Sequence, residues 1–313
     1  MIRIPKPPHG SIDWLMVRHR DENGNVTFGA SEAGALMGVS EYTSLADLCV
    51  AKLSEPEETP PTKAMLKGVI FEDALISHAA EELGLPFTTP TEMFRKDRFT
   101  VTLDGATDDL ATIVECKVTS AYTISDASDL PLSWVMQGHV QHFVTGADIW
   151  FSVFDRRQNL VVVQMPINEN VIEELMLQSE RVGHSLDRGM IPDPAWADMT
   201  ADLVQKVYQP VAGKTVEADE ELVNWIVDLE NTKRMIKELQ ADEDRAKDAI
   251  AKRMLDAETV TSADGSVLLS WKAQKGRTSF DAKSFEQDHP ELFGQYKREG
   301  APFRVMRFGK GNK

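Results

Sequence analysis

The stretch FTVTLDGATDDLATIVECK (residues 99–117) decides the expected fold, because apolar and polar residues alternate on both sides of a polar turn. Alternation with a period of two is typical of strands, so we expect strands over residues 99–105 and 111–117. Asp104 ends the first strand, and Glu115 and Lys117 project from one face of the second. If the two strands pair, three charged groups meet at one end of a sheet.

The residues around this stretch predict helices and further strands. Apolar side chains spaced by three and four predict a helix over residues 65–83, with Glu72 in the middle of its apolar stripe. Further helices are expected over residues 11–19, 44–53, 131–145 and 168–188, and a second strand pair over residues 149–155 and 160–166. These elements predict a mixed α/β (α+β) domain, a central mixed sheet flanked by helices, over residues 1–194.

Residues 195–313 have a different character and are expected to form a C-terminal extension. One long amphipathic helix or a helical pair is predicted over residues 217–256, and Asp264–Gly265 predicts a β-hairpin. Residues 270–313 hold 10 basic and 5 acidic side chains, so the tail is basic. The basic tail could contact the phosphates of DNA or bind a partner protein. For the long helix, the simpler interpretation is that its charged face is exposed to solvent.

Composition excludes several classes of protein. The chain has 313 residues, 42% of them hydrophobic and 27% charged, which is ordinary for a globular protein. No run approaches the roughly 18 apolar residues that a membrane span needs, so we expect a cytoplasmic protein without a membrane partner. Two cysteines are too few for a four-cysteine zinc site. The net charge of −16 argues against a protein that simply coats nucleic acid.

The acidic residues at the sheet end predict a metal site. Two carboxylates close together repel each other unless a cation neutralises them, and oxygen ligands suit Mg²⁺ or Mn²⁺. Lys117 beside Asp104 and Glu115 could orient or activate a water, as phosphodiester hydrolysis requires. A salt-bridged strand edge is the alternative, and Glu72 favours the metal site because it could complete the ligand set.

Several motifs in order along the chain carry a resemblance to a known family. They are Trp14 and Arg18, then FGASEAGALMGVSEYTS, KGVIFEDAL, LDG, ECK, VMQGHVQHFVTG and ADIWFSVFDRR, which end at Arg157. This order resembles the YqaJ/lambda-exonuclease family of phage-type recombination nucleases, within the PD-(D/E)XK superfamily. The resemblance implies a PD-(D/E)XK nuclease core.

The resemblance also implies roles for individual residues. Asp104 and Glu115 would bind the catalytic metals, two ions of Mg²⁺ or Mn²⁺, with the backbone carbonyl of Cys116 as a further ligand. Glu72 would help to position a metal or water, and Lys117 would be the catalytic lysine.

A second implied set would hold the 5′-phosphate of a DNA end. Arg18 and Ser31 match the family positions, and Thr102 stands in place of a serine that assists them. A guanidinium group and a hydroxyl suit a terminal phosphate. The local alternatives are an ion pair for Arg18 and a helix N-cap for Ser31.

The sequence departs from the family on the helix that follows. The family's Gln-x-Gln is Gln137-Gly-His139 here, so both residues are candidate DNA contacts and His139 is expected to contact substrate differently. His139 and His142 could suggest zinc, but their spacing of three on a glutamine-rich helix favours a core position or DNA contact.

The implied activity is a Mg²⁺-dependent 5′→3′ exonuclease that acts on double-stranded DNA ends. It would release mononucleotides and leave 3′ single strands for recombination by strand annealing. The resemblance further implies a toroidal homotrimer, a single-strand annealing protein as partner, and a phage or prophage origin in a bacterial host. The alternatives are an endonuclease of the same superfamily and a non-cleaving module that binds DNA ends.

Overall fold

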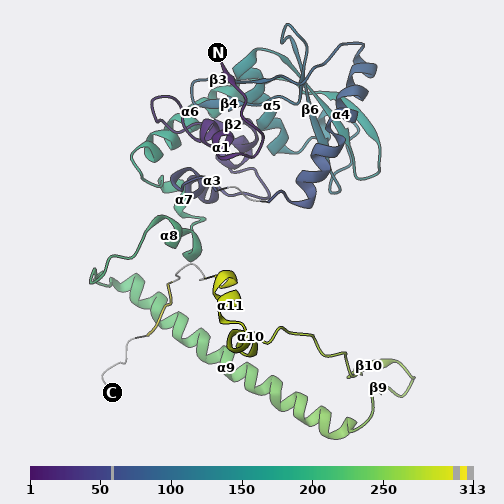
Figure 1. Ribbon diagram of the computed structural model, residues 1–313, viewed down its shortest axis with the longest axis vertical. Coiled ribbons are helices and arrows are strands. Elements are labelled where there is room, and N and C mark those ends of the chain that lie inside the picture. Colours follow the sequence, from purple (N-terminus) through teal and green to yellow (C-terminus); the bar gives the residue numbers. More distant parts are fainter. Residues whose placement is uncertain (58–59, 299–303, 309–313) are drawn as a thin grey trace. The chain divides into compact units, whose positions relative to one another are not determined.

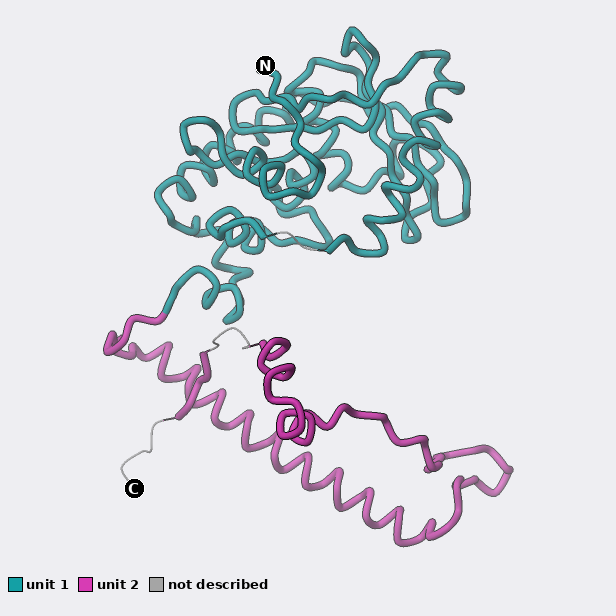
Figure 2. Tube along the Cα trace, in the orientation of Figure 1, with its two compact units in different colours: residues 1–209 teal, residues 210–313 magenta. Residues whose placement is uncertain are grey.

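The computed structural model describes residues 1–57, 60–298 and 304–308. The chain divides into two compact units, residues 1–209 and residues 210–313 (Figure 2). Helices α7 (Asp193–Trp196) and α8 (Ala201–Val207) contact α3 (Leu45–Leu53) and so belong to the first unit. The functional division into a core over residues 1–194 and an extension over residues 195–313 stays a prediction.

Two four-stranded sheets form the framework of the first unit. The first sheet has the order β1-β3-β4-β2, in which β2 and β4 are parallel and the other pairs are antiparallel. The second sheet has the order β5-β6-β7-β8, in which only β6 and β7 are parallel. The strand bounds are β1 Ile2–Pro5, β2 Phe28–Gly29, β3 Glu92–Lys96, β4 Phe99–Val101, β5 Gly105–Ala106, β6 Thr112–Val118, β7 Asp148–Phe154 and β8 Leu160–Gln164.

The structure corrects the strand pairing expected within residues 99–117. We expected one strand over residues 99–105 and considered its pairing with the next strand as a condition for the site. Instead β4 lies in the first sheet, and only β5 pairs with β6, through Gly105 opposite Val114 and Ala106 opposite Ile113. Asp104 therefore lies where the chain passes from one sheet to the other, one residue before the paired strand and in register with Glu115.

Helices α4 (Lys63–Leu83) and α5 (Leu132–Thr145) cover opposite faces of the second sheet, with β6 between them in Figure 1. Val114 of β6 packs against Ile76 of α4, whereas Ile113 belongs to the larger core that α5 helps to form. The remaining helices of the first unit are α1 Ile12–His19, the 3₁₀ turn η1 Ala30–Glu32, α2 Ala33–Leu36, the 3₁₀ turn η2 Ala127–Asp129 and α6 Glu169–Asp187.

Two serines that the sequence suggested as N-caps begin helices in the structure. Ser11 accepts a hydrogen bond from the Trp14 backbone N–H (3.2 Å) before α1, and Ser44 forms a capping box with Asp47 before α3. The mixed α+β class is confirmed, because helices cover two sheets that each mix parallel and antiparallel pairs.

The second unit holds one long helix and a hairpin. Helix α9 (Glu220–Met254) confirms the predicted long helix as a single element, and Asp219 caps it by accepting from the Leu222 N–H (2.8 Å). Strands β9 (Thr259–Thr261) and β10 (Val267–Ser270) confirm the predicted hairpin, with Gly265 at φ +86° in its turn. Two short helices follow, α10 Ala282–Asp288 and α11 Pro290–Tyr296.

Among the residues that the structure describes, no helix combines the length and the apolarity required to cross a bilayer.

Candidate active site

Strand β6 presents a carboxylate and an ammonium group on the same face. Glu115 and Lys117 are two residues apart, so both side chains face α5, while Cys116 between them faces α4 and lies near the Glu72 carbonyl (Sγ to O 3.8 Å). Glu115 is only 4% exposed, and its Oε1 accepts from Lys117 Nζ at 2.8 Å. The predicted pair is therefore formed, with a buried carboxylate and a partly exposed ammonium group.

Asp104 completes this group from the passage between the two sheets. Its Oδ2 accepts from the backbone N–H of Cys116 at 2.9 Å, which fixes the carboxylate beside β6. Burial, and then the Glu115 carboxylate, raise the pKa of Asp104 well above its usual range. The structure thus brings together Asp104, Glu115 and Lys117, as the sequence predicted.

Two glutamines of α5 hold the Glu115 carboxylate in place. Gln137 Nε2 donates to Oε1 and Gln141 Nε2 donates to Oε2, both at 2.6 Å. Gln137 Oε1 also accepts from Lys117 Nζ at 2.8 Å, so Gln137 connects both members of the pair. The sequence analysis missed Gln141, although its position four residues after Gln137 places both on one helix face.

His139, a predicted DNA contact, is buried and has partners within the protein. Its Nδ1 lies 2.7 Å from the Val135 carbonyl, and its Nε2 accepts from the Asn168 N–H at 3.0 Å. Burial lowers the pKa of His139, in keeping with a neutral ring. His142 Nδ1 instead lies 2.8 Å from the Ala147 carbonyl. These contacts favour the core reading of both histidines over the zinc and DNA readings.

Arg18 and Ser31 meet at the predicted phosphate position. Arg18 Nη2 of α1 donates to Ser31 Oγ of η1 at 2.9 Å. The Arg18 guanidinium also lies over the Trp14 ring, 4.3 Å from its centroid, and is stabilised there by a cation–π contact. The close approach requires a glycine, because a Cβ on Gly29 would lie 2.2 Å from Arg18 Nη2.

A single pocket of about 160 Å³ connects this arginine with the acidic group. Both predicted sets line it, the end-binding set and the hydrolytic set, together with side chains that the sequence analysis did not assign to the site. The lining residues are His9, Trp14, Arg18, Ala30, Ser31, Thr100, Thr102, Asp104, Glu115, Lys117 and Gln137. His9 stacks at a tilt on Trp14, with 4.5 Å between ring centroids, and no spacing in the sequence could have paired it with the site.

Glu72 lies near this pocket but outside its lining. Its half-buried carboxylate forms no hydrogen bond or ion pair with the residues that the structure describes. Burial raises its pKa, and Glu115 adds to that effect although Lys6 opposes it. The predicted apolar stripe of this helix is buried only in its second half, since Val69 is 61% exposed while Ile76 and Ala79 are buried.

The donor set suits a hard divalent cation. Asp104 and Glu115 are buried carboxylates whose mutual repulsion a cation would relieve, and oxygen donors are what Mg²⁺ and Mn²⁺ prefer. Among the described residues, no three histidine, cysteine or acidic side chains meet in ligating positions. Further oxygen donors would be needed, and the Cys116 carbonyl is the one that the family resemblance implies.

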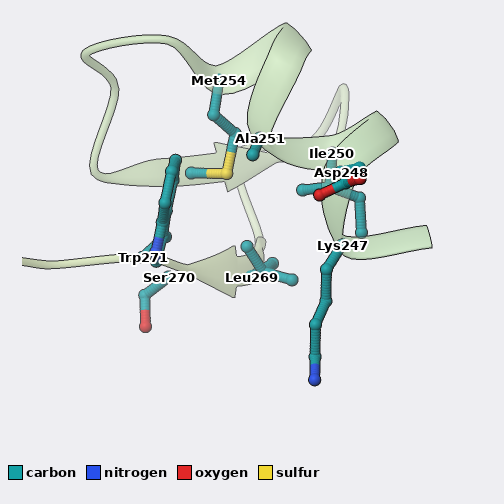
Figure 3. A pocket seen from close by; sticks show the side chains of 8 residues that line it. All are labelled: Lys247, Asp248, Ile250, Ala251, Met254, Leu269, Ser270 and Trp271. Carbon is teal, nitrogen blue, oxygen red and sulfur yellow. The ribbon is translucent and has the colours of Figure 1, made fainter. Parts of the chain in front are cut away.

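The second unit contains a larger pocket, of about 420 Å³, between the end of α9 and β10 (Figure 3). Ile250, Met254, Leu269 and Trp271 make it mainly apolar, and Lys247 extends away from the others in Figure 3. It lacks the paired carboxylates and the partly buried cation of the first pocket, so the first pocket is the candidate active site.

Comparison with known proteins finds a similarity to one family over less than half of the chain. Residues 13–148 match the family model described as a YqaJ-like viral recombinase domain. No curated protein matches the chain by sequence.

Solved structures with a similar arrangement include an alkaline exonuclease (LHK-Exo) from Laribacter hongkongensis, with 15% identity and a TM-score of 0.45, covering 62% of this chain and 94% of that chain. A phage-related exonuclease from Haemophilus somnus 129PT has 13% identity and a TM-score of 0.40, covering 52% of this chain and 95% of that chain. These values are too low to carry an argument about activity.

Proposed function

We propose that the protein is a metal-dependent 5′→3′ exonuclease that acts on double-stranded DNA ends, and the match of residues 13–148 to the YqaJ-like viral recombinase model supports this proposal. It would release mononucleotides and leave 3′ single strands for recombination by strand annealing. The observation that carries the proposal is the single pocket lined by both the Arg18–Ser31 pair and the Asp104–Glu115–Lys117 group.

Hydrolysis would take place at the acidic end of this pocket. Asp104, Glu115 and the Cys116 carbonyl would hold Mg²⁺ or Mn²⁺, in one or two ions, with Glu72 nearby to position an ion or a water. The bound metal would supply Lewis-acid stabilisation of charge on the phosphoryl oxygens.

Lys117 acts as a cation in this proposal. Burial lowers its pKa, but the Glu115 and Asp104 carboxylates outweigh burial, so the pKa lies above its usual value. A protonated ammonium beside the reacting phosphate can orient the attacking water and stabilise developing negative charge. Gln137 keeps Lys117 Nζ in position by accepting from it.

The other end of the pocket would hold the terminal phosphate. The Arg18 guanidinium and the Ser31 hydroxyl are the donor types that suit a phosphate, and Thr102 lines the same pocket. A site that requires a 5′-phosphate recognises a strand end and not an internal position. This set therefore favours an exonuclease over an endonuclease.

The wider assembly belongs to the same proposal. A toroidal homotrimer around the duplex would explain how an acidic protein retains DNA, and a single-strand annealing protein would take up the product strand. The cytoplasm of a bacterial host that carries the phage or prophage would be its place of action.

Digestion of defined DNA substrates tests the proposed function. Linear duplexes with either a 5′-phosphate or a 5′-hydroxyl are incubated with the protein and Mg²⁺, beside covalently closed DNA. We expect degradation of the phosphorylated linear strand, none of the closed circle, and no degradation in EDTA. Lys117→Ala should abolish cleavage, whereas Lys252→Ala, an exposed lysine on α9, should leave it unchanged.

Other outcomes would change the conclusion. Cutting of closed DNA would identify an endonuclease, and metal-independent binding of ends without cleavage would identify a non-cleaving module. Release of nucleotides from the 3′ end would contradict the assigned direction.

A further inference from the structure

A buried lysine lies behind the Arg18–Ser31 pair. Lys52, in the last turn of α3, has a side chain with 0% exposure, and its Nζ is 2.7 Å from Glu32 Oε2. Nζ also donates to the Arg18 carbonyl at 3.1 Å. An ammonium group buried without partners would be costly, so these two contacts explain how Lys52 is accommodated.

The contacts of Lys52 join the two elements that carry the predicted phosphate ligands. Arg18 belongs to α1, and Glu32 follows Ser31 in η1. Glu32 Oε2 accepts from the Gly29 N–H at 2.7 Å, so the carboxylate also holds the start of η1. In return, Arg20 Nη2 donates to the Lys52 carbonyl at 2.7 Å. The Lys52 ammonium is therefore bonded to both α1 and η1.

The charge of Glu32 makes Lys52 important for an anionic ligand. The Glu32 carboxylate is close enough to Arg18 for that guanidinium to help lower its pKa. A carboxylate beside a phosphate site repels the phosphate and competes for the arginine, unless another cation neutralises it. Lys52 is that cation, and it leaves the guanidinium of Arg18 available for the pocket.

We propose that the buried Lys52–Glu32 ion pair is a positioning device that sets the preference for a 5′-phosphorylated DNA end, by fixing Arg18 against Ser31 and cancelling the charge of Glu32. This inference rests on the proposed function of the pocket. Lys52 and Glu32 are positioning residues, because they act through Arg18 and Ser31.

Equilibrium binding without metal separates this role from catalysis. The probe is a short blunt duplex with either a 5′-phosphate or a 5′-hydroxyl, titrated in EDTA, and the readout is the ratio of the two dissociation constants. We expect the unaltered protein to favour the phosphate by about tenfold or more, which corresponds to about 1.4 kcal/mol.

Lys52→Met should reduce that ratio to about threefold or less, because Glu32 then repels the phosphate and attracts Arg18. The double variant Lys52→Met/Glu32→Gln removes both charges and should recover most of the ratio. Lys52→Arg, which keeps the charge, should also retain it. A purely structural pair would instead weaken binding of both duplexes equally and leave the ratio unchanged.

Gly29→Ala keeps the experiment decisive if Lys52→Met does not fold. Gly29 has φ −74° and ψ 153°, which alanine adopts without strain, but the new Cβ would displace the end of the Arg18 side chain. The ratio should fall in this variant. Val182→Ala, a buried change in α6 whose residue does not line the pocket, is the control for general destabilisation and should keep the ratio.

The results distinguish the two proposals. A folded Lys52→Met or Gly29→Ala protein with the unaltered ratio overturns the positioning role, while phosphate preference and cleavage by the unaltered protein still support the exonuclease. No phosphate preference in the unaltered protein would contradict the end-binding pocket itself.

Discussion

Lys52 and Lys117 each pair with a glutamate, at 2.7 and 2.8 Å, yet the two lysines differ in exposure and surroundings. The Lys52 side chain is fully enclosed, and burial lowers its pKa to about 8 although Glu32 opposes this effect. The Lys117 side chain is 20% exposed and lines the pocket, where two carboxylates raise its pKa despite burial. The lysine that lines the pocket therefore has two carboxylates nearby and an open side, whereas Lys52 has one acidic partner and no open side.

Replacing each of these two lysines by methionine should change the stability of the protein by different amounts, and the Lys52 variant should show the largest effect. Lys52→Met leaves Glu32, whose side chain is 22% exposed, without its cation. The change should lower the free energy of unfolding by about 2–3 kcal/mol, less than the loss of one partner of a fully buried pair. Lys117→Met should cost about 1 kcal/mol, because Gln137 and Gln141 still donate to Glu115 and water reaches the pocket. Urea unfolding in EDTA measures both. Equal losses of unfolding free energy in the two variants would contradict the proposed difference between Lys52 and Lys117.

A smaller effect concerns His19, which lies beside Lys52. Burial and then the Lys52 charge lower the pKa of His19 from 6.5 to about 4, although Glu32 opposes them. Between these values the unfolded chain binds a proton that the folded chain does not, so stability falls as the pH drops from about 6.5 towards 4. With screening at this half-buried site, the loss should be about 1–2 kcal/mol.

Urea unfolding of His19→Gln at about pH 7 and about pH 4.5 tests this expectation, because the variant should lose less stability over that interval. In Lys52→Met the pKa of His19, followed by NMR, should move back towards 6.5. An unchanged His19 pKa there would show that the Lys52 charge does not reach this ring.

The smallest effect per residue is expected from the basic side chains of the C-terminal unit, which extend the comparison to exposed lysines. The candidate DNA contacts among the basic residues of this tail are Lys272, Lys275, Arg277, Lys297, Arg298, Arg304 and Arg307. If Lys272 and Lys275 contact phosphates, changing each to Gln should reduce the salt slope of duplex binding by about 1 and leave the unfolding midpoint unchanged. An unaltered salt slope would show that these lysines do not contact DNA phosphates, and partner binding would then remain as the proposed role of the tail.

Local sequence patterns predicted most elements and the centre of the site. Alternation in residues 111–117 placed Glu115 and Lys117 on one face. Helical spacing could have shown that Gln141 shares a face with Gln137, but this residue was missed. The passage between sheets at Asp104 could not be predicted, because FTVTLDG contains no break before its glycine. Lys52 was also missed, because a lysine at a helix end is ordinarily solvated, and only tertiary packing places it against Glu32.

The passage of the chain from β4 to β5 has a consequence for product length. Thr102 and Asp104 both line the pocket, and only Leu103, which is buried in the core, separates them along the chain. Under the proposed function, this short and anchored segment acts as a molecular ruler between the captured phosphate and the bond to be cut. The step of the enzyme would then be set by covalent geometry, one nucleotide at a time, whatever the base.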